Sequence, residues 1–72
     1  MNVLGKKATF IPWALLDKTG GKTSDYGKPI TGTVTYVNEE HSYFAVTYWI
    51  HGKTFLENFK FSQIGKDVAI RG

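Results

Sequence analysis

The 72-residue chain is predicted to form an all-β domain of five strands. Three runs rich in β-branched and aromatic residues fill positions 30–61, and two short polar breaks separate them. No segment repeats apolar residues at helical spacing. The chain has no cysteine, so its stability must come from apolar burial, which an aromatic content of 15% suits. We therefore expect one small β domain over residues 1–72.

Residues 7–13 (KATFIPW) predict the first strand, and Pro12 marks its end because proline cannot donate to a β ladder. Residues 14–17 have room for one helical turn. Residues 18–29 (KTGGKTSDYGKP) predict a long surface loop with Tyr26 as its one large apolar side chain. Loops of this length in small domains often carry function, and a mobile connector is the alternative.

The next two strands are predicted at residues 30–37 and 43–50, with hairpin turns at residues 38–42 and 51–53. Side chains alternate between the two faces of a strand. In the second of these strands one face is the predicted core: Phe44, Val46, Tyr48 and Ile50. The other face carries Tyr43, Ala45, Thr47 and Trp49.

In the strand at residues 30–37, Gly32, Val34 and Tyr36 share one face, and a run of threonines marks the wetter face. Gly32 permits a sharp bend or the close approach of another strand. Both are useful where a small sheet closes on itself.

The third run, residues 53–61, is less regular. Strict alternation places Glu57 on one face with Phe55, Phe59 and Phe61. We expect instead a bulge at residues 57–58, which would turn Leu56 inward and spare the charge from burial. Residues 62–65 predict one 3₁₀ turn with Ile64 facing inward. Residues 66–71 predict the last strand.

This order of elements is that of a five-stranded SH3-like barrel, with a long first loop and a short 3₁₀ turn before the last strand. An OB-fold is the main alternative, but it usually places a helix between its third and fourth strands.

The second half of the chain also bears a more specific likeness. It resembles short accessory proteins of phages and prophages of Gram-positive bacteria, which share the sequence pattern TGxVxYVN, followed by HxxFxV, a glycine and ExFKF. The residues that match are Thr31, Gly32, Val34, Tyr36, Val37, Asn38, His41, Phe44, Val46, Gly52, Glu57, Phe59, Lys60 and Phe61. The resemblance implies a small adaptor, and residues 1–28 lie outside it.

The sequence offers no pattern for catalysis or a cofactor. Gly21-Lys22-Thr23 ends like a phosphate-binding loop, but the earlier glycine of that motif is Leu16 here. His41 and His51 fall in turns at opposite ends of one strand, too far apart to share a metal. No cysteine or serine elbow supplies a nucleophile. We therefore expect a protein that is not an enzyme and that needs no cofactor.

A binding surface remains. The net charge is +3, and all of the excess lies in residues 1–28, which carry five lysines and two aspartates. Trp13 is expected to close an end of the barrel, whereas the predicted partner-binding residues are Tyr26, Tyr43, Trp49, Lys22, Lys28 and Lys53. No signal peptide or membrane span is seen, so the expected location is the cytoplasm of a bacterial host cell.

Three hypotheses follow. The first is an adaptor or inhibitor of a host or phage protein, bound through the loop at residues 18–29 and the outer face of the strand at residues 43–50. The second is a nucleic-acid-binding barrel of the KOW type, with Lys6, Lys7, Lys22, Lys28 and Lys53 on phosphates and the same aromatics stacking on bases. A stripe of lysines beside the aromatic residues would favour nucleic acid, and scattered lysines would favour protein. The third is weak self-association through an open strand edge.

Overall fold

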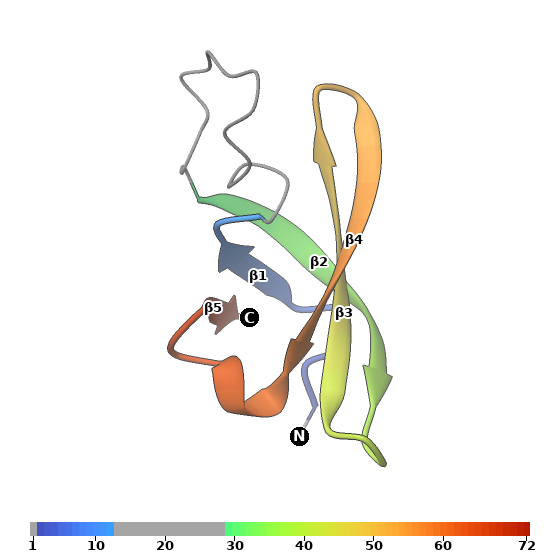
Figure 1. The fold of residues 1–72 in the computed structure, drawn as a ribbon, viewed down its shortest axis with the longest axis vertical. Coiled ribbons are helices and arrows are strands. Elements are labelled where there is room, and N and C mark those ends of the chain that lie inside the picture. The colour runs from blue at the N-terminus through green and yellow to red at the C-terminus, as the bar shows by residue number, and fades with distance from the viewer. Residues whose placement is uncertain (1, 13–28) are drawn as a thin grey trace.

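The computed structural model describes residues 2–12 and 29–72 and shows an all-β domain (Figure 1). Its strands form one antiparallel sheet in the order β4-β3-β2-β1-β5. The elements are β1 (Lys7–Phe10), β2 (Ile30–Asn38), β3 (Tyr43–Ile50), β4 (Lys53–Lys60), the 3₁₀ helix η2 (Phe61–Gln63) and β5 (Val68–Arg71). The predicted all-β class, the five strands and their order along the chain are confirmed, whereas the sheet of the described residues is not closed into the predicted barrel. No helix among the described residues is long and apolar enough to cross a membrane.

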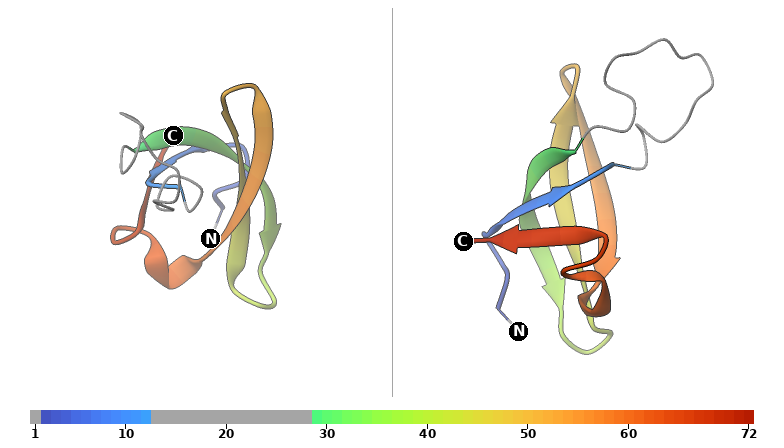
Figure 2. Two further views of the ribbon diagram at one scale, coloured as in Figure 1. Left: turned by 45° about the horizontal axis from the view of Figure 1, so that its top comes forward. Right: turned by 90° about the vertical axis from the view of Figure 1, so that its left-hand side faces the viewer.

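Strand β2 is long and curved, so it belongs to two parts of the sheet (Figure 1). Its first residues, Ile30 to Thr33, pair with β1, and its remainder pairs with β3. Strands β1 and β5 consequently cross the β3–β4 hairpin at a steep angle (Figure 2). Gly32 lies at the bend, where an added Cβ would lie 2.6 Å from the carbonyl oxygen of Thr47. The predicted close approach at Gly32 is confirmed.

Two tight turns join the three strands of the meander. The turn between β3 and β4 consists of His51 and Gly52, with φ values of 52° and 81°, and Lys53 already belongs to β4. Positive φ at both central residues is typical of a two-residue type I′ hairpin, which glycine tolerates best. In the other turn, the side-chain carbonyl of Asn38 accepts a hydrogen bond from the His41 amide at 2.9 Å. Both predicted hairpins are confirmed.

The core lies on the concave side of the sheet. Phe44, Val46 and Tyr48 of β3 are buried, as predicted, and Ile50 is half-buried against them. The ring of Phe10 packs edge-on against Tyr48 and Phe59, with centroids 5.1 and 5.0 Å apart. The other members of the core cluster are Val3, Ala8, Val34 and Val68. Pro12 is also buried, as is Ala45 on the outer face of β3.

The predicted bulge at residues 57–58 is wrong. Strand β4 pairs with β3 without interruption, so Phe55, Glu57 and Phe59 face inward and Leu56 faces outward with 61% of its surface exposed. The half-buried carboxylate of Glu57 accepts a hydrogen bond from the hydroxyl of Tyr48 at 3.0 Å. A charge on the inner face is tolerated because it has this hydrogen-bond partner.

The irregularity lies in β2 instead, between Val34 and Tyr36. Because one residue is inserted there, the alternation of faces shifts by one position. Tyr36, expected on the core face with Val34, is therefore 48% exposed, and Val37 packs against the core in its place.

The boundaries of three elements, β1, η2 and β5, differ from the predicted ones. The first strand ends at Phe10 rather than residue 13, the 3₁₀ turn begins one residue early at Phe61, and the last strand begins at Val68. Ile64 packs against the core, as predicted. In the part of the chain that the structure describes, no ladder joins β4 to β5, so both remain edges of an open sheet.

Candidate functional site

Three of the six predicted partner-binding residues can be placed. Tyr43 is half-buried, whereas Trp49 and Lys53 are exposed, and the predicted exposure of Trp49 is confirmed. Lys22, Tyr26 and Lys28 lie outside the described residues, as do the helical turn predicted at residues 14–17, the loop predicted through residue 28 and Trp13.

The structure does not bring these three residues together. Tyr43 and Trp49 both point to the outer face of β3, but six residues of extended chain place them about 20 Å apart. Lys53 is paired with Ile50 and therefore emerges from the opposite face of the hairpin to Trp49. The outer surface thus has two separate regions, one at each end of β3.

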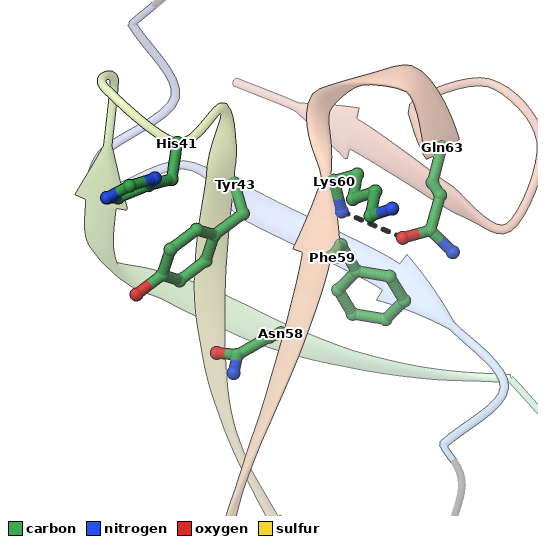
Figure 3. Close-up of a pocket in the computed structure, with 6 residues that line it drawn as sticks. All are labelled: His41, Tyr43, Asn58, Phe59, Lys60 and Gln63. Atoms are coloured by element: carbon green, nitrogen blue, oxygen red, sulfur yellow. Dashed lines mark hydrogen bonds between the residues drawn. The ribbon is translucent and has the colours of Figure 1, made fainter.

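A surface hollow of about 320 Å³ lies at the Tyr43 end (Figure 3). Its walls come from three segments: the turn after β2, the paired ends of β3 and β4, and η2. We call it the Tyr43 hollow, and its lining residues are His41, Tyr43, Asn58, Phe59, Lys60 and Gln63. The hollow combines an apolar wall with four polar side chains, which is the usual character of a binding pocket.

Tyr43 is held in place by its neighbours on the outer face. Its ring lies 6.0 Å from that of Tyr36, at a tilt of 51°. Asn38 is paired with Tyr43 across the two strands, and its side-chain NH₂ group donates a hydrogen bond to the Tyr36 hydroxyl at 3.3 Å. These contacts restrict the Tyr43 side chain and so lower the entropy that a partner would lose on binding it.

The opposite wall is held by Gln63. Its side-chain oxygen accepts a hydrogen bond from the backbone amide of Lys60 at 2.7 Å (Figure 3). Its side-chain nitrogen donates to the carboxylate of Asp67 at 3.0 Å. Gln63 therefore ties η2 to both the end of β4 and the turn before β5. Lys60 is the cation on this rim, and none of the six lining residues is acidic.

A second hollow of about 370 Å³ shares Phe59 and Gln63 but lies on the inner side of β4. The lining of this second hollow includes one cation, Lys66, and two carboxylates, Glu57 and Asp67, so the hollow carries charges of both signs. Burial, and then the hydrogen bond and charge of Glu57, raise the pKa of the neighbouring Tyr48 hydroxyl to about 12. At neutral pH Tyr48 is therefore protonated and acts as a hydrogen-bond donor.

The Trp49 end has a different character. Trp49 and Leu56 are 60% and 61% exposed, and both lie on the outer face of the β3–β4 hairpin. Trp49 is opposite Thr54, and Leu56 is its diagonal neighbour on β4. We call these three residues the Trp49 patch. Its two large side chains are apolar, whereas the Tyr43 hollow combines an apolar wall with polar groups.

The basic side chains of the described residues are scattered. Lys7 and Arg71 are neighbours on the outer face of β1 and β5, where the Lys7 ammonium donates to the Thr33 hydroxyl at 3.4 Å. Lys6 precedes β1, and its side chain lies against Gly72, which directly follows β5, so these three cations form one group away from the hollow. Lys53 and Lys60 stand at opposite ends of β4, and Lys66 lies in the turn before β5. Within this part of the chain, one lysine, Lys60, lines the hollow beside Tyr43.

The two histidines of the chain lie far apart in the structure. His41 and His51 lie in turns at opposite ends of β3, as predicted. No group of three or more His, Cys, Asp or Glu residues is close enough to hold a metal ion within the ranges 2–12 and 29–72.

Comparison with known proteins gave no relatives: no family model, curated protein or solved structure matches the chain.

Of the six lining residues, sequence reasoning predicted only Tyr43 as a binding residue. It missed His41, Asn58, Phe59, Lys60 and Gln63, and also Tyr36, which packs against Tyr43. Tyr36 was assigned to the core because the bulge in β2 has no clear sequence mark. Asn58 was placed at a bulge that does not exist. Gln63 carries a usable signal, since a glutamine at the third position of a short helix can bond back to the chain before it.

Proposed function

We propose that this chain is a non-enzymatic protein-binding module with an SH3-like architecture, and that the Tyr43 hollow is its contact site. Several features support the architecture: a curved second strand shared by two parts of the sheet, two hairpins and a 3₁₀ turn before the last strand. The resemblance of residues 31–61 to phage accessory proteins favours an adaptor or inhibitor of a host protein.

The observation that carries the proposal is the set of contacts around Tyr43. An aromatic ring that packs against a second tyrosine stands on the wall of a hollow lined by two stretches of the chain, residues 41–43 and 58–63. Tyrosine contributes strongly to protein interfaces because it offers a large apolar area and a polar tip at low entropic cost. A hollow of about 320 Å³ accommodates one or two side chains of a partner.

The lining also favours one partner chemistry. Tyr43 and Phe59 offer apolar surface, and the ammonium of Lys60 stands on the rim without a carboxylate in the lining. A partner segment that presents an apolar side chain next to an aspartate or glutamate would complement both features. We therefore infer an acidic, partly apolar protein surface as the ligand.

Nucleic acid is the competing ligand. It is less well supported because a backbone of phosphates requires several cations along one track. The described cations stand on different faces and at different ends of the sheet, and one lines the hollow. The fold-level likeness to RNA-binding small barrels is an analogy only.

The test is capture from a nuclease-treated bacterial lysate by the immobilised chain. Wild type, Tyr43→Ala and Trp49→Ala are compared, because the two aromatic residues lie on the same face of the same strand. We expect a captured protein whose recovery falls roughly tenfold or more for Tyr43→Ala and changes little for Trp49→Ala. Equal recovery with Tyr43→Ala would contradict the proposal.

A parallel titration separates the two ligand classes. Fluorescence anisotropy is measured with labelled single-stranded DNA, duplex DNA and RNA at low and at physiological salt. The proposal predicts no binding at physiological salt, since few phosphate contacts can form. Tight binding to one nucleic acid at physiological salt would replace the protein ligand with that nucleic acid.

A further inference from the structure

Strand β4 is an unusual edge strand. It is eight residues long, pairs with β3 throughout without a bulge, and is the last strand of the sheet order. Natural proteins usually protect such an edge with bulges, prolines or charges along its length. Here the six residues between Lys53 and Lys60 carry one charge, Glu57, which points inward and accepts the Tyr48 hydrogen bond.

The hydrogen bonds at the end of β4 show which backbone groups face outward. The amide of Phe61 donates to the Ser42 carbonyl at 3.0 Å, whereas the amide of Lys60 turns away to Gln63. In an antiparallel ladder, successive residues alternate between facing the neighbour and facing away. Thr54, Leu56 and Asn58 therefore direct their N–H and C=O groups away from β3, toward the free edge.

A second β4 strand can pair antiparallel with this edge in several symmetric registers. Four of them, with the two-fold axis at Phe55, Leu56, Glu57 or Asn58, pair about five or more residues of each strand. A two-fold axis at Glu57 sets two carboxylates directly opposite each other, which is unfavourable. An axis at Phe55 or Asn58 pairs only about five residues of each strand before a turn or η2 intervenes. An axis at Leu56 pairs residues 53–59 of both copies, with Thr54 opposite Asn58 and no like charges opposed.

The side chains favour the same register. Leu56 would face Leu56 of the second copy on the outer face, and the neighbouring Trp49 of each copy would flank this pair. Two apolar side chains that are 60% and 61% exposed in the single chain would then be partly covered. The area is smaller than a standard stable interface, so the association would be weak and dependent on concentration.

We propose that β4 pairs antiparallel with β4 of a second copy of this chain, with Leu56 on the two-fold axis. The two sheets would join into one continuous sheet. This inference is independent of the proposed partner site, because it rests on the edge of β4 and the Trp49 patch.

The first test is sedimentation of the full chain over a concentration series up to about 1 mM. We compare Leu56→Lys with Leu4→Lys, since both leucines are similarly exposed, at 61% and 58%, but Leu4 lies outside the sheet. We expect wild type and Leu4→Lys to dimerise alike and Leu56→Lys to remain monomeric. No dimer in wild type, or equal dimerisation of the two variants, would overturn the proposal.

The second test checks the register and uses the absence of natural cysteine. Leu56→Cys should form a homodimeric disulfide on mild oxidation, because facing Cα atoms in such a pair lie about 5.5 Å apart. Thr54→Cys alone should crosslink poorly, since the two positions would be about 13 Å apart. A mixture of Thr54→Cys and Asn58→Cys should give the mixed disulfide. Homodimers of Thr54→Cys as abundant as those of Leu56→Cys would exclude this register.

Discussion

The two ends of β3 present aromatic residues to the same outer face and yet differ in what surrounds them. Tyr43 is half-buried, lies 6.0 Å from the ring of Tyr36 and stands on the wall of a hollow. Trp49 is 60% exposed, and its neighbours across the hairpin are Thr54 and Leu56. Exposure alone would favour Trp49 as the binding residue.

We place the proposed binding site at Tyr43 because a neighbouring ring supports its side chain, whereas Trp49 is mainly exposed. The Tyr43 hollow is lined by two stretches of the chain, residues 41–43 and 58–63, and Gln63 ties η2 to the end of β4 and to the turn before β5 with two hydrogen bonds. The Trp49 patch lies on the β3–β4 hairpin, next to an edge of β4 that no other described strand pairs with. We assign partner binding to the first region and self-pairing to the second. Asn58 lines the hollow and also lies on the β4 edge, where it would pair with Thr54 of a second copy, so we expect the two events to compete.

The largest expected effect is a difference in stability between a substitution in the wall of the hollow, at Phe59, and one in the Trp49 patch, at Leu56. Phe59→Ala should reduce the free energy of unfolding by about 3–5 kcal/mol, since Phe59 packs against Phe10 and Phe44. Leu56→Ala, three residues earlier on the same strand, should cost less than about 0.5 kcal/mol. Urea unfolding followed by circular dichroism measures both. If Phe59→Ala does not fold, Phe59→Leu should show the same ranking, and equal costs would contradict the assigned faces.

The second effect comes from the inner side of the same hairpin. The pKa of Tyr48 is raised to about 12, whereas an unfolded tyrosine has a pKa near 10. Above pH 10 the unfolded chain loses this proton while the folded chain keeps it. The stability associated with Tyr48 is therefore complete below pH 10 and falls by roughly 2–3 kcal/mol as the pH approaches 12.

Tyr48→Phe removes this titration. Its free energy of unfolding, measured by urea at pH 9 and pH 11.5, should fall less steeply with pH than that of wild type. Two parallel pH profiles would show that Tyr48 keeps an ordinary pKa in the folded state.

A smaller effect tests the support of the hollow. Gln63→Ala removes the bonds to the Lys60 amide and to Asp67, and should cost about 1 kcal/mol of stability. It should also weaken partner capture, because η2 is then no longer tied to the end of β4 and to the turn before β5. Ser62→Ala, an exposed neighbour on the same 3₁₀ helix, is the control and should change neither quantity. Unaltered capture by Gln63→Ala would exclude a positioning role.

The smallest effect concerns the patch itself. Trp49→Ala should change the free energy of unfolding by no more than about 0.5 kcal/mol, since most of its side chain is exposed. Partner capture should be unaltered, and self-association in sedimentation should decrease. A destabilisation above about 2 kcal/mol would mean that Trp49 belongs to the core.

Much of the fold was predictable from the sequence. The alternation in β3 correctly separated Phe44, Val46 and Tyr48 from Tyr43 and Trp49, and glycine and short polar runs marked the turns. The error at Glu57 arose because a charge among phenylalanines suggests a bulge. Its hydrogen-bond donor, Tyr48, lies on another strand and was counted only as an apolar core residue.

The site was predicted only in part, for a related reason. Tyr43 follows from strand alternation alone, but Asn58 and Gln63 join it through pairing between distant segments. Tyr36 was misplaced because a single inserted residue in β2 reverses the faces that follow it. A local pattern gives the face of a residue within one strand and does not give its neighbours across the sheet.

The most direct test of the central claim is photocrosslinking from the two ends of the hairpin in bacterial lysate. Because the chain has no cysteine, a benzophenone label can be attached to His41→Cys at the rim of the hollow or to Thr54→Cys in the Trp49 patch. We predict a partner adduct from the label at position 41, whereas the label at position 54 should crosslink the chain to a second copy. A partner adduct from position 54 and none from position 41 would contradict the account.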